Sequence, residues 1–509
     1  MLFNSAEFLF LFLPLTLILY HLLRTHLSVK SGLFLLIIAS LFFYAWWKPV
    51  YLLLLGASVI CNFYIAKAIY LYRKTWLITV GVSLNLMTIG YYKYSAFFVN
   101  NIAAFTGYEW QLEQVLLPLA ISFFTFQQIA YLVDVHRHQV IEHSFSNYLL
   151  FVCFFPQLIA GPIVHHSEMM PQFRQRLQLS ARHFAVGFSI FTIGLFKKTV
   201  LADGIAVYAN PIFNQADSGI TLDFFTAWGG AFAYTFQLYF DFSGYSDMAI
   251  GLALLFGIAL PLNFNSPYKA LNIVDFWRRW HITLSRFLRD YLYISLGGNR
   301  LGFVRRYSNL IITMVLGGLW HGAGWNFLIW GALHGSYLVV NNSYSHFHNK
   351  YLSFIKERWF KPVAWFITFL AVVVGWVFFR AQSIDGALNM LTAMAALQGI
   401  SLPAGLMTQL EFLTPIFEQL HVTSSLGGGL VFVKTWFWII ALMALSLLAP
   451  NVLQLFYNQL PEQTRKNVKN ANCTIQWQAT TIWALFISVL FILAISTLGR
   501  VSEFLYFNF

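Results

Sequence analysis

The residue in this sequence best suited to chemistry is His321, in the stretch GGLWHG. It interrupts an apolar segment, where ionisable side chains are costly and mark functional sites by default. An imidazole with a pKa near about 6.5 can take the proton of a hydroxyl group as that oxygen attacks a thioester. The alternative is a packed core histidine satisfied by one hydrogen bond. His334, in GALHG, competes for the same role.

The residues around His321 favour a narrow passage. Trp320 precedes it and Gly322 follows it, and glycines also stand at positions 317, 318 and 324. Glycines let helix backbones approach closely or leave room for a substrate. Trp320 and Gly322 are therefore expected to line a tunnel in which His321 acts.

A second polar group lies in YFDFSGYSDMAIG, residues 239–251. Asp241, Tyr245 and Asp247 either line the same tunnel or bridge neighbouring helices, and the sequence leaves both open. Further back, FFPQLIAGPIVHH at 154–166 carries two prolines that should break its helix. A broken helix at membrane depth is tolerated where it lines a cavity.

Residues 275–291 have the pattern of one amphipathic helix lying in the membrane interface. His281 falls on the boundary between an aromatic face and a charged face. Arginine binds phosphate through two parallel hydrogen bonds, so we expect the charged face to dock an anionic acyl donor such as coenzyme A. Anchoring to lipid headgroups is the alternative, and the two are compatible. The arginines concerned are Arg278, Arg279, Arg286 and Arg289.

The chain ends in FLYFNF, which contains Tyr506. An aromatic belt at the membrane surface explains such a tail. A tyrosine hydroxyl is also a possible acyl acceptor, since a covalent intermediate divides one difficult transfer into two easier ones.

The composition decides which elements hold these residues. Of the 509 residues, 59% are hydrophobic and 10% are charged, against about 25% charged in soluble domains. Long continuous apolar runs predict transmembrane helices rather than a barrel. The net charge of +12 lies mainly in short loops, as expected for cytoplasmic loops and not for a nucleic-acid partner. The three cysteines, far apart, predict neither a metal site nor a disulfide framework.

The sequence predicts an all-α polytopic membrane protein with roughly 11–14 spans, plus interfacial and re-entrant helices around a central tunnel. Lysine and arginine in the first and third loops place the N-terminus outside. The less apolar residues 385–430 are expected to form a long loop with short helices, within a single domain 1–509. The predicted spans are 6–23, retained and not a signal peptide, 31–47, 50–71, 76–93, 114–133, 145–164, 184–201, 222–240, 244–262, 308–325, 326–342, 362–380, 431–450 and 478–498.

The chain strongly resembles the membrane-bound O-acyltransferase family, in particular its bacterial branch of alginate and peptidoglycan O-acetylation membrane subunits. The resemblance covers most of residues 1–340, whereas 345–475 carry no matching motif and 478–509 hold the last span and the tail. The matching stretches are FLFLFLPL, FYAWW, FPQLIAGPI, LYFDFSGYSDMAIGLALLFGI, DFWRRWHITLSRFLRDYLYISLGGNR and GGLWHGAGWNFLIWGALHG.

The resemblance implies a helical fold with a tunnel through the membrane and assigns roles to three residues. His321 matches the invariant histidine of the family, and His281 matches a second histidine of this branch. The tail resembles the end of a small partner peptide whose tyrosine is proposed to carry the acyl group in transit; Tyr506 is the matching residue.

The function expected from these patterns is transfer of an acetyl group across the bacterial inner membrane for O-acetylation of an extracytoplasmic polysaccharide. Acetyl-coenzyme A or an acyl carrier would be the cytosolic donor, with no permanently bound cofactor and no metal. A separate periplasmic acetyltransferase would pass the group to the polysaccharide. The alternatives are a transporter or channel without covalent chemistry, which Asp241 and Asp247 would suit, and an acyltransferase that modifies lipids.

Overall fold

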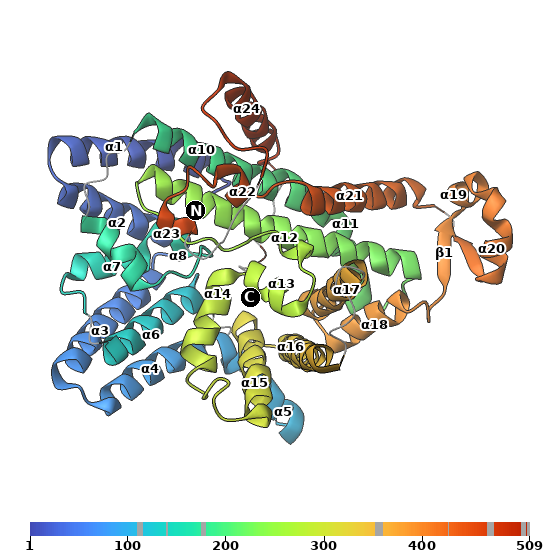
Figure 1. Cartoon of the computed structure of the whole chain (residues 1–509), viewed down its shortest axis with the longest axis horizontal. Helices are drawn as coiled ribbons and strands as arrows, with labels where there is room; N and C mark the ends of the chain where they lie inside the picture. The colour runs from blue at the N-terminus through green and yellow to red at the C-terminus, as the bar shows by residue number, and fades with distance from the viewer. Residues whose placement is uncertain are drawn as a thin grey trace.

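The computed structural model is an almost wholly helical molecule, and the prediction of an all-α protein is confirmed (Figure 1). It describes residues 1–108, 116–138, 141–174, 180–351, 360–425, 427–465, 473–499 and 505.

Among the residues that the structure describes, the first half of the chain contains twelve α-helices joined by short π and 3-10 segments. They are η1 (Phe8–Phe12), α1 (Leu13–His26), α2 (Val29–Ala45), α3 (Tyr51–Tyr72), α4 (Thr75–Ile89), η2 (Gly90–Tyr94), α5 (Ser95–Thr106), α6 (Ile121–His138), α7 (Phe145–Cys153), α8 (Phe155–Leu158), α9 (His166–Met169), η3 (Met170–Arg174), α10 (Ala181–Phe196), η4 (Lys197–Ala202), α11 (Asp203–Asp217) and α12 (Phe224–Leu255).

The described part of the second half adds further helices and two short strands. They are η5 (Pro267–Lys269), α13 (Ile273–Arg279), α14 (Ile282–Phe287), η6 (Leu288–Tyr293), α15 (Phe303–His321), α16 (Trp325–Tyr351), α17 (Lys361–Arg380), α18 (Ile384–Met394), β1 (Ile400–Pro403), α19 (Ala404–Gln409), η8 (Glu411–Leu413), α20 (Thr414–Gln419), β2 (Val422–Ser425), α21 (Gly429–Leu448), α22 (Val452–Phe456), α23 (Glu462–Arg465) and α24 (Thr481–Ser496).

Within the described residues, five helical stretches are long and apolar enough to cross a membrane. Large apolar side chains on them face outward, among them Leu53, which is 75% exposed, and Phe437, which is 70% exposed. Lipid, not water, is the solvent in which such surfaces are stable. The five stretches are Phe8–His26, Tyr51–Tyr72, Ala181–Asp217, Lys361–Arg380 and Gly429–Phe456.

The prediction of two spans at 222–240 and 244–262 is wrong, because α12 is one continuous helix of 32 residues. It runs through the middle of the molecule (Figure 1) and is buried along most of its length. Its carboxylates do not interrupt it because each meets a lysine: Asp241 pairs with Lys198 and Asp247 with Lys197.

Glycines let α12 approach α10 closely. A β-carbon at Gly251 would lie 2.6 Å from the main-chain oxygen of Gly187, and one at Gly244 would lie 2.8 Å from that of Gly194. Both distances are too short for real contacts, so the two helices pack backbone against backbone at these points. This contact fixes the position of the central helix.

The prediction of one amphipathic helix over 275–291 is wrong. α13 ends at Arg279 and α14 begins at Ile282, with His281 between them in the left-handed region at φ 42°. The main-chain oxygen of Asn263 accepts from the N–H of Ile282 at 3.0 Å, so the break is held by a neighbouring segment of chain. His281 is consequently fully buried and does not lie on the boundary between two faces of one helix.

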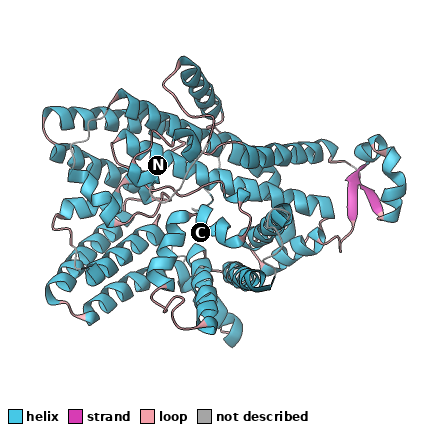
Figure 2. Ribbon diagram, in the orientation of Figure 1, coloured by secondary structure: helices cyan, strands magenta, loops and turns pink. Residues whose placement is uncertain are grey.

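Residues 385–430 contain the predicted short helices and also a small sheet that was not predicted. β1 pairs with β2 in parallel, with Ile400 opposite Val422 and Pro403 opposite Ser425. Figure 2 shows these strands at one end of the molecule, beside α19 and α20. The predicted break in 154–166 is present, because α7 ends at Cys153 and only the short α8 contains Pro156.

Candidate active site around His321

His321 is the last residue of α15 and is 3% exposed. Its ring packs edge-on against the rings of Trp330 and Phe379, with centroids 5.1 Å away in both cases. It also lines a small cavity of about 70 Å³, together with Trp320, Lys93 and residues of the segment 117–123. The histidine is therefore enclosed but borders open space, unlike a residue sealed in dry packing.

His281, the second histidine of the family resemblance, lies near the same tryptophan, Trp320. The ring centroid of Trp320 is 4.9 Å from that of His321 and 6.2 Å from that of His281. Asn263 orients His281, since its Oδ1 lies 3.1 Å from Nδ1 of the ring. The structure thus gathers His321, Trp320 and His281 from α15 and the α13–α14 break.

His334, the competing candidate, lies in an aromatic cage. Its ring centroid is 4.8 Å from that of Trp330 and 5.3 Å from that of Trp277. A β-carbon at Gly375 would lie 2.8 Å from its Nε2, so that side is closed as well. His334 is fully buried and lines neither the small cavity beside His321 nor the larger cavity that Phe379 lines. Neither of its ring nitrogens has a hydrogen-bond partner among the described residues, so His334 is closely packed but does not match a core histidine satisfied by one hydrogen bond.

A larger cavity of about 1330 Å³ begins just beyond His321 in the chain. Its wall includes Phe379, the ring in contact with His321. Amide side chains and one arginine supply most of its polar groups, and several aromatic rings supply the apolar ones. The lining includes Phe97, Asn100, Asn101, Asp203, Asn210, Gln237, Trp325, Asn326, Phe327, Phe379, Arg380, Gln382 and Leu505.

The carboxylates of α12 form ion pairs within the helix bundle. Lys198 Nζ lies 2.7 Å from Asp241 Oδ1 and 2.8 Å from Asp203 Oδ1, and all three side chains are buried. Lys197 Nζ lies 2.6 Å from Asp247 Oδ2. These pairs bridge η4, α11 and α12, and only the Asp203 member reaches the lining of the large cavity.

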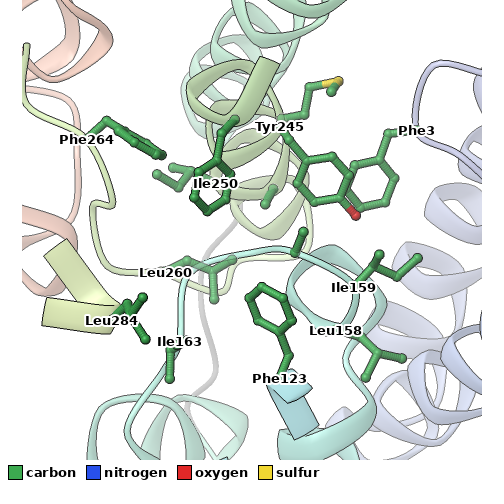
Figure 3. Close-up of a cluster of buried hydrophobic side chains, with 14 of the residues drawn as sticks. Phe3, Phe123, Leu158, Ile159, Ile163, Tyr245, Ile250, Leu260, Phe264 and Leu284 are labelled. Carbon is green, nitrogen blue, oxygen red and sulfur yellow. The ribbon is translucent and has the colours of Figure 1, made fainter. Parts of the chain in front are cut away.

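Tyr245, the third member of the polar group, lies in the apolar core. Its ring stacks on Phe3 with centroids 4.8 Å apart. Figure 3 shows this stack above Phe123 and Ile159. The last two also line the small cavity with His321, so this apolar cluster supports one wall of the candidate site. A β-carbon on Gly322, the residue after His321, would lie 2.1 Å from the ring of Phe327, so close packing accounts for the glycine at this position.

The arginines expected to bind the donor differ in how strongly they are engaged. Arg286 forms a two-pronged pair with Glu168, at 2.7 and 2.9 Å. Arg279 pairs with Asp275 at 2.9 Å, and Arg289 pairs with the neighbouring Asp290 at 2.7 Å. Arg278 is exposed.

Tyr506 lies outside the described residues, and Leu505 is the described residue next to it. The N–H of Leu505 donates to Asp241 Oδ2 at 3.2 Å, and Leu505 lines the large cavity. The approach of the chain's end to α12 was not expected from the sequence.

Sequence reasoning also missed Lys93 and Tyr94, whose side chains reach the last turn of α15. It missed Lys197 and Lys198 as the partners of Asp247 and Asp241. The pair of lysines within the apolar stretch GLFKKTVLA was a usable signal, because two buried cations require anions nearby. Lys93 offered no such signal, since its partners are main-chain oxygens.

Comparison with known proteins gives the family. The family model described as membrane-bound O-acyltransferase matches residues 136–380. A peptidoglycan O-acetyltransferase of Helicobacter pylori is 43% identical over 100% of this chain and 98% of its own length. The chain belongs to the membrane-bound O-acyltransferase family.

Other relatives extend the comparison within this family. A probable alginate O-acetylase AlgI of Pseudomonas aeruginosa is 44% identical over 77% of this chain and 75% of its own length. A teichoic acid D-alanyltransferase of Streptococcus thermophilus is 27% identical over 52% of this chain and 69% of its own length. Membership identifies a multi-pass membrane protein and an acyl-transferring enzyme, as predicted from the sequence, and the model's matched region includes His281, Trp320 and His321.

Proposed function

We propose that this enzyme moves an acetyl group from a cytosolic thioester, acetyl-coenzyme A, to the outer face of the bacterial inner membrane, where it serves the O-acetylation of peptidoglycan. The observation that carries the proposal is the position of His321: buried at the end of α15, yet bordering a cavity and in ring contact with Phe379 of a second, larger one.

The direction of transfer follows from the charges at the ends of α15. Arg305 and Arg306 stand at its first turn, which by the positive-inside bias is the cytosolic end. The His321 end then points outward, and the large cavity belongs to the outer side. A thioester reaches the site from the basic segment 272–306, and the acyl group leaves through the large cavity.

In the proposed step, the imidazole of His321 removes the proton of an acceptor hydroxyl as that oxygen attacks the thioester carbon. The C–S bond breaks, the thiolate of coenzyme A takes the proton from the imidazolium, and an oxygen ester remains. Tyr506 is the proposed first acceptor. Its neighbour Leu505 lines the large cavity and is bonded to α12, which supports a role for the tail at this site.

A separate periplasmic acetyltransferase would take the acetyl group from the tyrosine ester and pass it to a sugar hydroxyl, which restores the Tyr506 phenol. Peptidoglycan is preferred to alginate as the polymer because the peptidoglycan O-acetyltransferase of Helicobacter pylori matches the chain end to end, whereas the alginate relative of Pseudomonas aeruginosa matches 77% of it.

The test is mass spectrometry of the cell-wall muropeptides and exopolysaccharides of a strain lacking this gene, complemented with wild type, His321→Ala or His183→Ala. We expect O-acetylated muropeptides with wild type and with His183→Ala, because His183 is exposed and far along the chain from the site. His321→Ala should abolish them. A His321→Ala protein that inserts at the wild-type level and supports wild-type acetylation refutes the proposal; loss of acetyl groups from an exopolysaccharide alone refutes the choice of polymer.

A further inference from the structure

The C-terminal end of α15 presents a problem of hydrogen bonding. The last four carbonyl groups of an α-helix have no partner within the helix. In α15 these belong to residues 318–321, which include His321 itself, and this end of the helix is buried. Each of these oxygens needs a partner, because an unpaired buried carbonyl is costly.

All four carbonyl oxygens have one. The N–H of Gly322 donates to Gly318 at 3.4 Å. The hydroxyl of Tyr94 donates to Leu319 at 2.6 Å. Lys93 Nζ donates to Trp320 at 2.6 Å and to His321 at 3.1 Å. Three of the four bonds therefore come from two neighbouring residues more than two hundred positions earlier in the chain.

Lys93 and Tyr94 reach α15 together because of the local helix geometry. They close η2, a π-helical segment between α4 and α5. A π-helix turns less per residue than an α-helix, which brings consecutive side chains closer to one face, and such segments are frequent at functional sites. The positive charge of Lys93 also suits the C-terminal end of a helix, where the macrodipole is negative.

The hydrogen bonds of Lys93 argue against a direct chemical role. An ammonium group has three N–H donors. Lys93 Nζ has three acceptors within reach: the two carbonyls of α15 and Ser122 Oγ at 3.3 Å. No donor is left to stabilise an oxyanion on a substrate, although Lys93 lines the small cavity with His321.

We propose that Lys93 and Tyr94 are positioning residues, which hold the last turn of α15 so that the imidazole of His321 keeps its place in the cavity. The inference rests on the proposed role of His321 and adds residues that act through it. We call the three hydrogen bonds from Lys93 and Tyr94 to α15 the clamp. Because its acceptors are main-chain oxygens, the clamp fixes the helix end without depending on the side chains at 319 and 320.

The test uses the full chain in proteoliposomes together with the periplasmic acetyltransferase and peptidoglycan as the final acceptor. The activity is the transfer of radiolabelled acetyl from acetyl-coenzyme A to that polymer. Lys93→Met keeps the stem and removes all three donors, and Tyr94→Phe removes one hydroxyl. We expect kcat to fall about 10- to 100-fold for Lys93→Met and about 3- to 10-fold for Tyr94→Phe, with KM for the donor within about 3-fold of wild type, because a misplaced group slows chemistry more than binding. Lys48→Met, which removes a partly exposed lysine that lies over Tyr51, is the matched control and should leave kcat unchanged.

A second readout does not depend on activity. Hydrogen–deuterium exchange of a peptide covering residues 315–322 should become faster in Lys93→Met and Tyr94→Phe than in the control, while peptides from α10 and α12 exchange as in wild type. Unchanged exchange at 315–322, or exchange that rises equally across all helices, refutes the clamp. If both variants keep the wild-type kcat while His321→Ala is inactive, the clamp is refuted and the proposed function stands. If His321→Ala is active, the proposed function itself is refuted.

Discussion

The main-chain N–H of Leu505 donates a hydrogen bond of 3.2 Å to Oδ2 of Asp241, across 264 positions of sequence. The other oxygen of the same carboxylate faces Lys198 at 2.7 Å. One buried side chain of the central helix therefore connects an ion cluster with the segment that carries Tyr506. Stability of the bundle and placement of the tail depend on the same group.

Asp241→Asn should lower the stability of the protein. It removes one of the two carboxylates that share the buried ammonium group of Lys198. Because Asp203 still balances that charge, the expected loss is that of a hydrogen bond to a charged group, about 1.5–3 kcal/mol. Thermal unfolding in detergent should show a clear drop in midpoint. Asp275→Asn, which breaks the partly exposed pair with Arg279, should cost no more than about 1 kcal/mol. Equal decreases in the midpoint of thermal unfolding for the two variants would contradict a stabilising role of the buried Asp241–Lys198 pair.

Tyr506→Phe should abolish acetyl transfer to the polymer while leaving insertion unchanged, because only the accepting hydroxyl is lost. Intact-mass spectrometry after incubation with acetyl-coenzyme A should find a hydroxylamine-sensitive acetyl group on wild type and none on the variant. Tyr72→Phe, at an exposed tyrosine, is the control and should behave as wild type. Full polymer acetylation by Tyr506→Phe shows that the acetyl group does not pass through the tail.

Gly251→Ala should be strongly destabilising. Its β-carbon would lie 2.5 Å from the main-chain nitrogen of Phe191, and backbone atoms cannot move aside as a flexible side chain can. Overpacking of this kind costs about 1–3 kcal/mol or more. Gly56→Ala, within α3, meets nothing within 4 Å and should stabilise by up to about 1 kcal/mol. Chemical unfolding of both variants measures these changes in the free energy of unfolding. An unchanged value for Gly251→Ala disproves the tight contact of α10 with α12.

Substitutions of Arg278 and Arg286 should have different effects, the first on binding of the acyl donor and the second on the stability of the protein. Arg286 is held by both oxygens of Glu168, so Arg286→Ala should mainly reduce stability, and a Glu168→Ala background should remove most of that effect. Arg278 is exposed, and Arg278→Ala should raise KM for acetyl-coenzyme A several-fold at unchanged kcat. If Arg286→Ala raises KM for acetyl-coenzyme A more than Arg278→Ala does, Arg286 and not Arg278 binds the donor.

The sequence predicts the helical membrane class and the enzyme family because both depend on local signals. Apolar runs identify helices in lipid, and the stretch around His321 resembles the family and lies within the region that the family model matches. The break at His281 could not be predicted in this way. Residues 275–291 keep helical periodicity throughout, and the break depends on Asn263, in a different segment.

The same limit applies to the division of α12 into two spans. Asp241 and Asp247 resemble an interruption when the segment is considered alone, since isolated charges do not belong in an apolar helix. Lys198 and Lys197 neutralise them from η4, so the helix continues. Contacts of side chains with a distant backbone, such as those of Lys93, leave no pattern in the sequence at all.

The length of α12 determines how the protein should respond to membranes of different thickness. Its 32 residues would extend roughly 48 Å at about 1.5 Å per residue, whereas the hydrocarbon core measures about 30 Å. Other helices surround α12, so its length need not match the thickness of the bilayer. Thicker or thinner bilayers should tilt peripheral helices such as α3, α21 and α24, whose apolar side chains are exposed. The ion pairs on α12 would then keep their geometry in host membranes of differing composition.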